Sequence, residues 1–102
     1  MVAMVACMDM SMERPQAGEL YYHYKHDPQI SVENFAYEII GVALETESES
    51  ELVIYRPLYE SSHQLFARPL ELFVGTVEIG GVTRDRFTQI TDSDLLAVLQ
   101  QR

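Results

Sequence analysis

Residues 35–44 and 52–59 read FAYEIIGVAL and LVIYRPLY, and the acidic run ETESESE at 45–51 separates them. Both apolar segments are rich in β-branched and aromatic residues, which is typical of strands. Both faces of the first segment are apolar after Ile39, which predicts a central strand covered on both sides, with a bulge at Gly41. Because the acidic run suits a solvated turn, the two segments together predict a β-hairpin.

The flanking segments extend this pattern in both directions along the chain. Residues 20–25 alternate between two faces, as a strand does. The stretch TVEIGGVT at 76–83 predicts a second hairpin, because two glycines supply the positive φ that a type I′ turn requires. RFTQI at 86–90 predicts the last strand.

Two helical signals accompany the strands. Arg68-Pro69 predicts the start of a single helical turn near 69–74, because proline suits the first helical position. Thr91, with Asp94 three residues later, resembles a capping box and predicts a short C-terminal helix. The whole pattern predicts a mainly β fold: a small, strongly curved antiparallel sheet or barrel of SH3-like size, with five or six short strands.

The length of 102 residues fits one domain. We expect a disordered leader at residues 1–17, a small β domain at 18–90 and the C-terminal helix at 91–102. The formal net charge of -9 marks an acidic protein and argues against nucleic acid or an anionic membrane as partner. No stretch is long and apolar enough to cross a bilayer, and the single cysteine, Cys7, favours a reducing, cytoplasmic setting.

A series of short motifs runs through this region. In order they are His23-Tyr24-Lys25, YEIIGVA at 37–43, Glu45-Thr46-Glu47, LVIY at 52–55, RPLELF at 68–73, Val77 and Arg86-Phe87. In order and spacing, over roughly positions 18–90, they resemble the bacterial domain of unknown function 1653 (DUF1653). The resemblance implies that family's fold and no activity, because none is established for it. The family pattern places a glycine after His-Tyr-Lys, whereas this chain has His26 there and the extra residues 27–36.

The basic residues point to a candidate binding site. Five of the seven Lys and Arg residues lie in the strand-forming region: Lys25, Arg56, Arg68, Arg84 and Arg86. We expect a barrel to gather some of them in a cationic, aromatic-lined recess that suits a carboxylate or a phosphate. The candidate ligand-binding residues are His23, Lys25, Tyr55, Arg68 and Arg86. The alternative is that the two arginines of this set pair with Glu71, Glu78 or Asp85, and that the tyrosines only pack.

The sequence predicts no metal site, no cofactor and no catalytic nucleophile. His23 and His26 are an odd number of residues apart and would point to opposite faces of a strand, which leaves His63 as the one other histidine. Ser61-Ser62-His63 places hydroxyls beside an imidazole, but no serine lies in a Gly-x-Ser-x-Gly elbow.

Two classes of function fit these observations. The first is a non-catalytic binding or interaction module for a small anionic molecule or a partner protein. The second is a small enzyme acting on an anionic metabolite, such as a nucleotide derivative, with His23 as general acid or base. The sequence favours the first class. Both classes require His23, Lys25 and Arg68 to converge in the folded protein.

Overall fold

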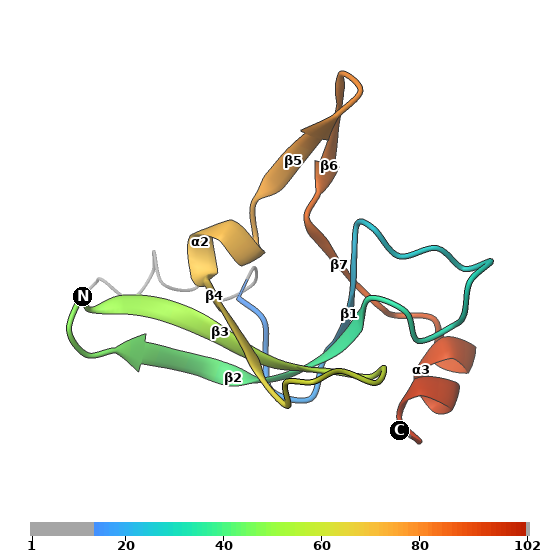
Figure 1. The fold of residues 1–102 in the computed structure, drawn as a ribbon, viewed down its shortest axis with the longest axis horizontal. Helices are drawn as coiled ribbons and strands as arrows, with labels where there is room; N and C mark the ends of the chain where they lie inside the picture. The colour runs from blue at the N-terminus through green and yellow to red at the C-terminus, as the bar shows by residue number, and fades with distance from the viewer. Residues whose placement is uncertain (1–13, 102) are drawn as a thin grey trace, which may run out of the picture.

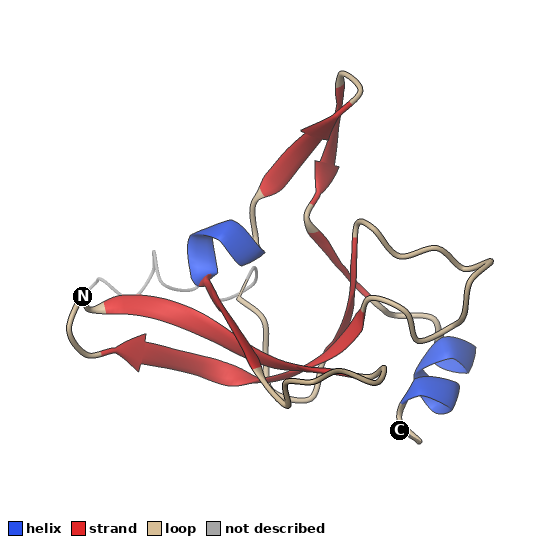
Figure 2. Cartoon of the chain, viewed as in Figure 1, coloured by secondary structure: helices blue, strands red, loops and turns tan. Residues whose placement is uncertain are grey.

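The computed structural model describes residues 14–101, which form seven strands and two short helices (Figure 1). In chain order these are β1 (Leu20–His23), β2 (Ala36–Glu45), β3 (Ser50–Pro57), β4 (Phe66–Pro69), α2 (Leu70–Phe73), β5 (Thr76–Ile79), β6 (Val82–Asp85), β7 (Phe87–Gln89) and α3 (Ser93–Leu99). The mainly β prediction is confirmed, as the predominance of strands in Figure 2 illustrates. Cys7 and the first thirteen residues of the predicted leader lie outside the described residues.

Five of these strands form one antiparallel sheet in the order β4-β3-β2-β1-β7. The sheet curves but does not close, because β4 and β7 are its two edges. Of the two predicted forms, the strongly curved antiparallel sheet is confirmed, and the closed barrel is not observed. Strands β5 and β6 lie between β4 and β7 in the chain, but they pair only with each other and project from the sheet as a separate ribbon (Figure 1).

The prediction of five or six strands missed β4. Arg68-Pro69 suggested the start of a helix, and both residues instead end an edge strand that pairs with β3. Proline is tolerated there because an edge strand has one side without ladder partners. Pro69 then serves as the N-cap of α2, with φ -51 and ψ 137, so the predicted helical turn does follow it directly.

The hairpin of β2 and β3 is confirmed, and so is its bulge. Ile39 pairs with Tyr55 and Gly41 pairs with Ile54, so Ile40 is the extra residue. The second predicted hairpin is also confirmed. Gly80 and Gly81 have φ values of 58° and 80°, as a type I′ turn requires.

Each face of the sheet carries its own hydrophobic core. The first core contains Tyr37, Ile39, Val53, Tyr55, Phe73 and Phe87. The second contains Leu20, Ala36, Leu58, Ile90 and Leu99. The two cores alternate along the strands, because successive side chains of a strand point to opposite faces. Helix α2 covers the first core with the buried Phe73, and α3 covers the second with the buried Leu99.

The helix α3 begins one residue later than its predicted capping box. Asp92, not Thr91, is the N-cap, and its carboxylate accepts hydrogen bonds from the backbone N–H groups of Asp94 (2.8 Å) and Leu95 (3.1 Å). A carboxylate accepts two such bonds and also interacts favourably with the helix dipole, so the aspartate prevails over the adjacent threonine. Within residues 14–101, no helix is long and apolar enough to span a membrane.

Candidate functional site

The first core lies on the face of the sheet that carries the predicted site residues. In the sheet, His23 is opposite Phe87, and Arg68 is opposite Val53. Directly opposed residues in antiparallel strands point to the same face. His23 and Arg68 therefore extend from two different strands toward the same face as the buried rings of Tyr55 and Phe87.

Arg68 rests on an aromatic floor. Its guanidinium carbon lies 5.5 Å from the centroid of the Phe87 ring, and its Nε donates a long hydrogen bond of 3.4 Å to the hydroxyl of Tyr55. Tyr55 is only 4% exposed, so this hydroxyl has a well-defined position. A guanidinium held through Nε and stacked on a ring keeps both terminal nitrogens available for a two-pronged contact.

Arg86 precedes Phe87 in the chain, and its positive charge acts on His23. Its backbone is held on both sides, because its N–H donates to the carbonyl of Gly75 (3.0 Å) and its carbonyl accepts from the N–H of Tyr24 (2.9 Å). Its side-chain Nε is buried and has no hydrogen-bond partner among the described residues. A buried donor without a partner is costly, and it commonly marks the place of a ligand or an ordered water.

His23 lies among these groups. Its ring is 5.0 Å from the ring of Phe87, 4.4 Å from that of Tyr24 and 5.7 Å from that of Phe35. Burial, together with the positive charges of Arg68, Lys25 and Arg86, lowers the pKa of His23 to about 4. The imidazole is therefore neutral at pH 7.

The structure thus places three of the predicted site residues, His23, Tyr55 and Arg68, around the ring of Phe87, and the charges of Lys25 and Arg86 lie close enough to act on His23. We use the name cationic recess for these five residues (His23, Lys25, Tyr55, Arg68 and Arg86). The three charges act on His23, and Tyr55 contacts Arg68. Lys25 is the exposed member, in the loop after β1. The positions of His23, Tyr55 and Arg68 around one ring are observed, whereas the role of the five residues in binding a ligand stays a prediction.

The charges of the cationic recess lack acidic partners in the part of the chain that the structure describes. The ion pairs found there join Arg14 to Glu51 (2.7 Å) and Arg56 to Glu38 (2.6 Å). The alternative in which Arg68 and Arg86 pair with nearby carboxylates therefore does not hold within residues 14–101.

The sequence analysis missed the aromatic residues that shape the recess. Phe87 is its floor, and the Arg-Phe motif was the available signal. Phe35 was not foreseen, because its left-handed backbone, with φ of 54°, depends on tertiary contacts. Bulky residues rarely adopt this conformation, and such strain concentrates at functional sites. The backbone N–H of His23 donates to the carbonyl of Phe35 (2.9 Å), which ties the strained residue to β1.

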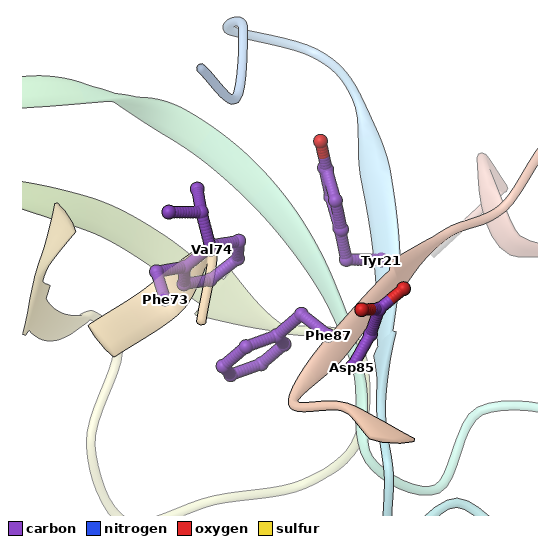
Figure 3. Close-up of a pocket in the computed structure, with 5 residues that line it drawn as sticks. All are labelled: Tyr21, Phe73, Val74, Asp85 and Phe87. Carbon is purple, nitrogen blue, oxygen red and sulfur yellow. The ribbon is translucent and has the colours of Figure 1, made fainter. Parts of the chain in front are cut away.

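A hollow of about 290 Å³ lies next to Phe87, between β1, α2 and the base of the β5–β6 ribbon (Figure 3). It is lined by Tyr21, Phe73, Val74, Asp85 and Phe87. Figure 3 shows the carboxylate of Asp85 at the side of this hollow, near the backbone of Tyr21. The negative charge of Asp85 makes this hollow unsuitable for an anion. We therefore expect an anionic ligand to prefer the cationic recess to this hollow.

The other motifs considered for catalysis are local in the structure. Ser62 Oγ lies 3.2 Å from Nδ1 of His63, and the His63 N–H donates to Ser61 Oγ (3.2 Å), all within one exposed loop. His26 stacks on Tyr22 with a centroid distance of 3.6 Å, away from His23. Among residues 14–101, no group of three His, Cys, Asp or Glu side chains is placed to hold a metal ion.

Comparisons with known proteins agree on one family. A family model described as a protein of unknown function, DUF1653, matches residues 19–89. The fold is similar to the crystal structure of a DUF1653 protein from Bordetella bronchiseptica, with a TM-score of 0.58 and 28% sequence identity. That similarity covers 76% of this chain and 86% of the other. No curated protein matches this sequence.

Proposed function

The chain belongs to the DUF1653 family, as its motifs predicted, and from its own geometry we propose that it is a non-catalytic binding module for a small anionic molecule. One observation carries this proposal. The guanidinium of Arg68, held by Tyr55 and stacked on Phe87, lies in a group of three cations without a carboxylate partner among residues 14–101.

Electrostatics explains why such a group favours an anion. Like charges that lie close together on a partly buried surface raise the free energy of the folded state. Burial lowers the pKa of His23 most, and the positive charges of Arg68 and Lys25 lower it further. Because the chain as a whole carries a net charge of -9, this local excess of positive charge is not a general property of its surface. A bound carboxylate or phosphate would relieve the repulsion.

Arg68 is also well prepared to bind. A side chain that is already oriented loses less conformational entropy when it grips a ligand than a free one does. Its planar guanidinium can give two parallel hydrogen bonds to two oxygens of the same oxyanion, which a lysine ammonium cannot do. We therefore expect Arg68 to contribute more to binding than to folding.

The test is a thermal-shift screen of the full chain against nucleotides, sugar phosphates and carboxylates, because a ligand that binds only the folded state raises its melting temperature. Hits are titrated against wild type, Arg68→Lys and Arg68→Met, with Arg84→Met as the charge-matched control. Arg84 is exposed on the β5–β6 ribbon. We expect Arg84→Met to bind as wild type does, Arg68→Lys to bind at least tenfold more weakly, and Arg68→Met to lose nearly all binding.

Two results would contradict the proposal. In the first, Arg68→Met binds every hit as wild type does. In the second, Arg68→Met loses more than about 2 kcal/mol of stability in the absence of ligand, which would make Arg68 a structural residue.

A further inference from the structure

The donors and acceptors of the cationic recess can be assigned one by one. Lys25 and the two arginines only donate hydrogen bonds. The hydroxyl of Tyr55 accepts from Nε of Arg68, which leaves its own proton free to donate. The remaining group, the imidazole of His23, can donate or accept at each ring nitrogen, depending on its tautomer.

The backbone decides the state of this imidazole. The N–H of Lys25 donates to Nδ1 of His23 at 3.1 Å. A backbone N–H can only donate, so Nδ1 must present a lone pair, and a neutral ring then carries its proton on Nε2. No described residue accepts a hydrogen bond from this Nε2. His23 is therefore a neutral donor at the recess.

The surroundings of His23 keep it neutral. The groups that face it are Tyr24 and Lys25 from the loop after β1, Phe35 before β2, Arg68 from β4, and Arg86 and Phe87 at the start of β7. All the charged members of this set are positive. Each of them opposes a further positive charge on the ring.

Together these assignments define the chemistry of the ligand. We propose that the recess takes a tetrahedral, dianionic oxyanion, such as a phosphate monoester, and that His23 binds it as a neutral donor through Nε2. This inference rests on the proposed function. At least three donors are available, because Arg68 offers two terminal nitrogens and His23 offers an unpartnered N–H. A carboxylate carries a single negative charge in one plane, whereas a phosphate monoester or sulfate dianion balances more of the positive charge of Lys25, Arg68 and Arg86 and directs its oxygens toward donors on different strands.

The same assignment makes His23 a poor general base. Its only lone pair, on Nδ1, already accepts the N–H of Lys25, and Nε2 carries a proton. Accepting a second proton would break that hydrogen bond and place a fourth positive charge beside Lys25, Arg68 and Arg86. The geometry therefore supports binding over acid–base catalysis at this position.

Two measurements on the full chain test the proposal. Long-range ¹H–¹⁵N NMR spectra of the histidine rings report which nitrogen of His23 is protonated. Calorimetric titrations with inorganic sulfate between pH 5.5 and 8 report the charge of the recess, because sulfate remains a dianion over this range. Inorganic phosphate serves as the second tetrahedral probe, acetate as the carboxylate control, and His23→Phe as the variant that keeps a ring without a donor.

We expect the neutral Nε2–H tautomer from pH 5.5 to 8 and a sulfate affinity that changes less than about twofold over this range. Acetate should bind at least tenfold more weakly than sulfate and phosphate. His23→Phe should weaken sulfate binding about tenfold, which is typical for loss of a hydrogen bond to a charged group. A melting temperature of His23→Phe close to that of wild type at pH 7 would show that the loss lies in binding.

Several outcomes would overturn the inference. They are an Nδ1–H tautomer, an imidazolium ring at pH 6, or a sulfate affinity that falls more than tenfold from pH 5.5 to 7.5. Acetate binding as tightly as sulfate, with both lost in Arg68→Met, would reject the tetrahedral dianion and leave the proposed anion-binding function intact. Both proposals would be rejected if none of the three anions and no compound of the screen binds.

Discussion

Acid should destabilise this protein through His23. Burial and the charges of Arg68, Lys25 and Arg86 lower the pKa of His23 in the folded state to about 4, from 6.5. Between these two values the unfolded chain takes up a proton that the folded chain does not. The free energy of unfolding is therefore not reduced by His23 above pH 6.5, and it decreases as the pH falls from about 6.5 toward about 4.

The size of this effect follows from the difference in pKa. One pKa unit corresponds to about 1.4 kcal/mol, so the full difference would amount to roughly 3 kcal/mol. Solvent reaches the half-buried ring of His23 and screens the charges around it. We therefore expect a loss of about 1–2 kcal/mol between pH 7 and pH 4.5 that is specific to this residue.

Urea unfolding at the two pH values measures this loss in wild type and in His23→Asn. Asparagine does not titrate, and its side-chain oxygen can still accept the N–H of Lys25. Carboxylates also titrate in this range but are common to both proteins, so the difference between the two pH effects isolates His23. Arg68→Met should shrink the wild-type effect, because its charge helps to lower the pKa, whereas Arg84→Met should not. Parallel losses in wild type and His23→Asn would refute this reasoning.

Three further predictions concern stability, each measured by urea unfolding at pH 7. Asp92→Ala should cost about 1 kcal/mol because it removes the N-cap of α3. Thr91→Ala should cost less than about 0.5 kcal/mol, and equal costs for the two variants would contradict Asp92 as the N-cap. Gly75→Ala should cost about 1–2 kcal/mol, because the added Cβ would lie 2.9 Å from a carbonyl oxygen of α2. Gly41→Ala should be nearly neutral, because there is open space around that position, and a larger cost at Gly41 than at Gly75 would contradict the packing described for these two glycines. Glu49→Gly should stabilise the protein by about 0.5–1 kcal/mol, because glycine adopts the positive φ of 61° without strain. Glu49→Gln should change stability by less than about 0.5 kcal/mol, and a larger loss would mean that the carboxylate has a specific partner.

Local chemistry made several parts of the fold predictable. The turn at Gly80-Gly81 depends on the φ preference of glycine, which neighbours hardly affect. The hairpin of β2 and β3, with its bulge between Ile39 and Gly41, follows from strand propensity on both sides of an acidic run. The positions of Arg68 and Arg86 relative to the family motifs were sufficient to identify them as candidates for one site.

Tertiary contacts decided the features that give the site its properties. Whether the sheet closes depends on whether β5 and β6 pair with its edges or with each other, and strand propensity is the same in either case. The left-handed backbone of Phe35 is strained locally and persists because β1 holds it. The buried Nε of Arg86 and the lowered pKa of His23 arise because folding brings together residues that are far apart in sequence. The sequence by itself thus determined the hairpins, the family and the candidate residues, whereas burial and the sum of nearby charges, which exist only in the folded chain, determined the state of each side chain in the recess.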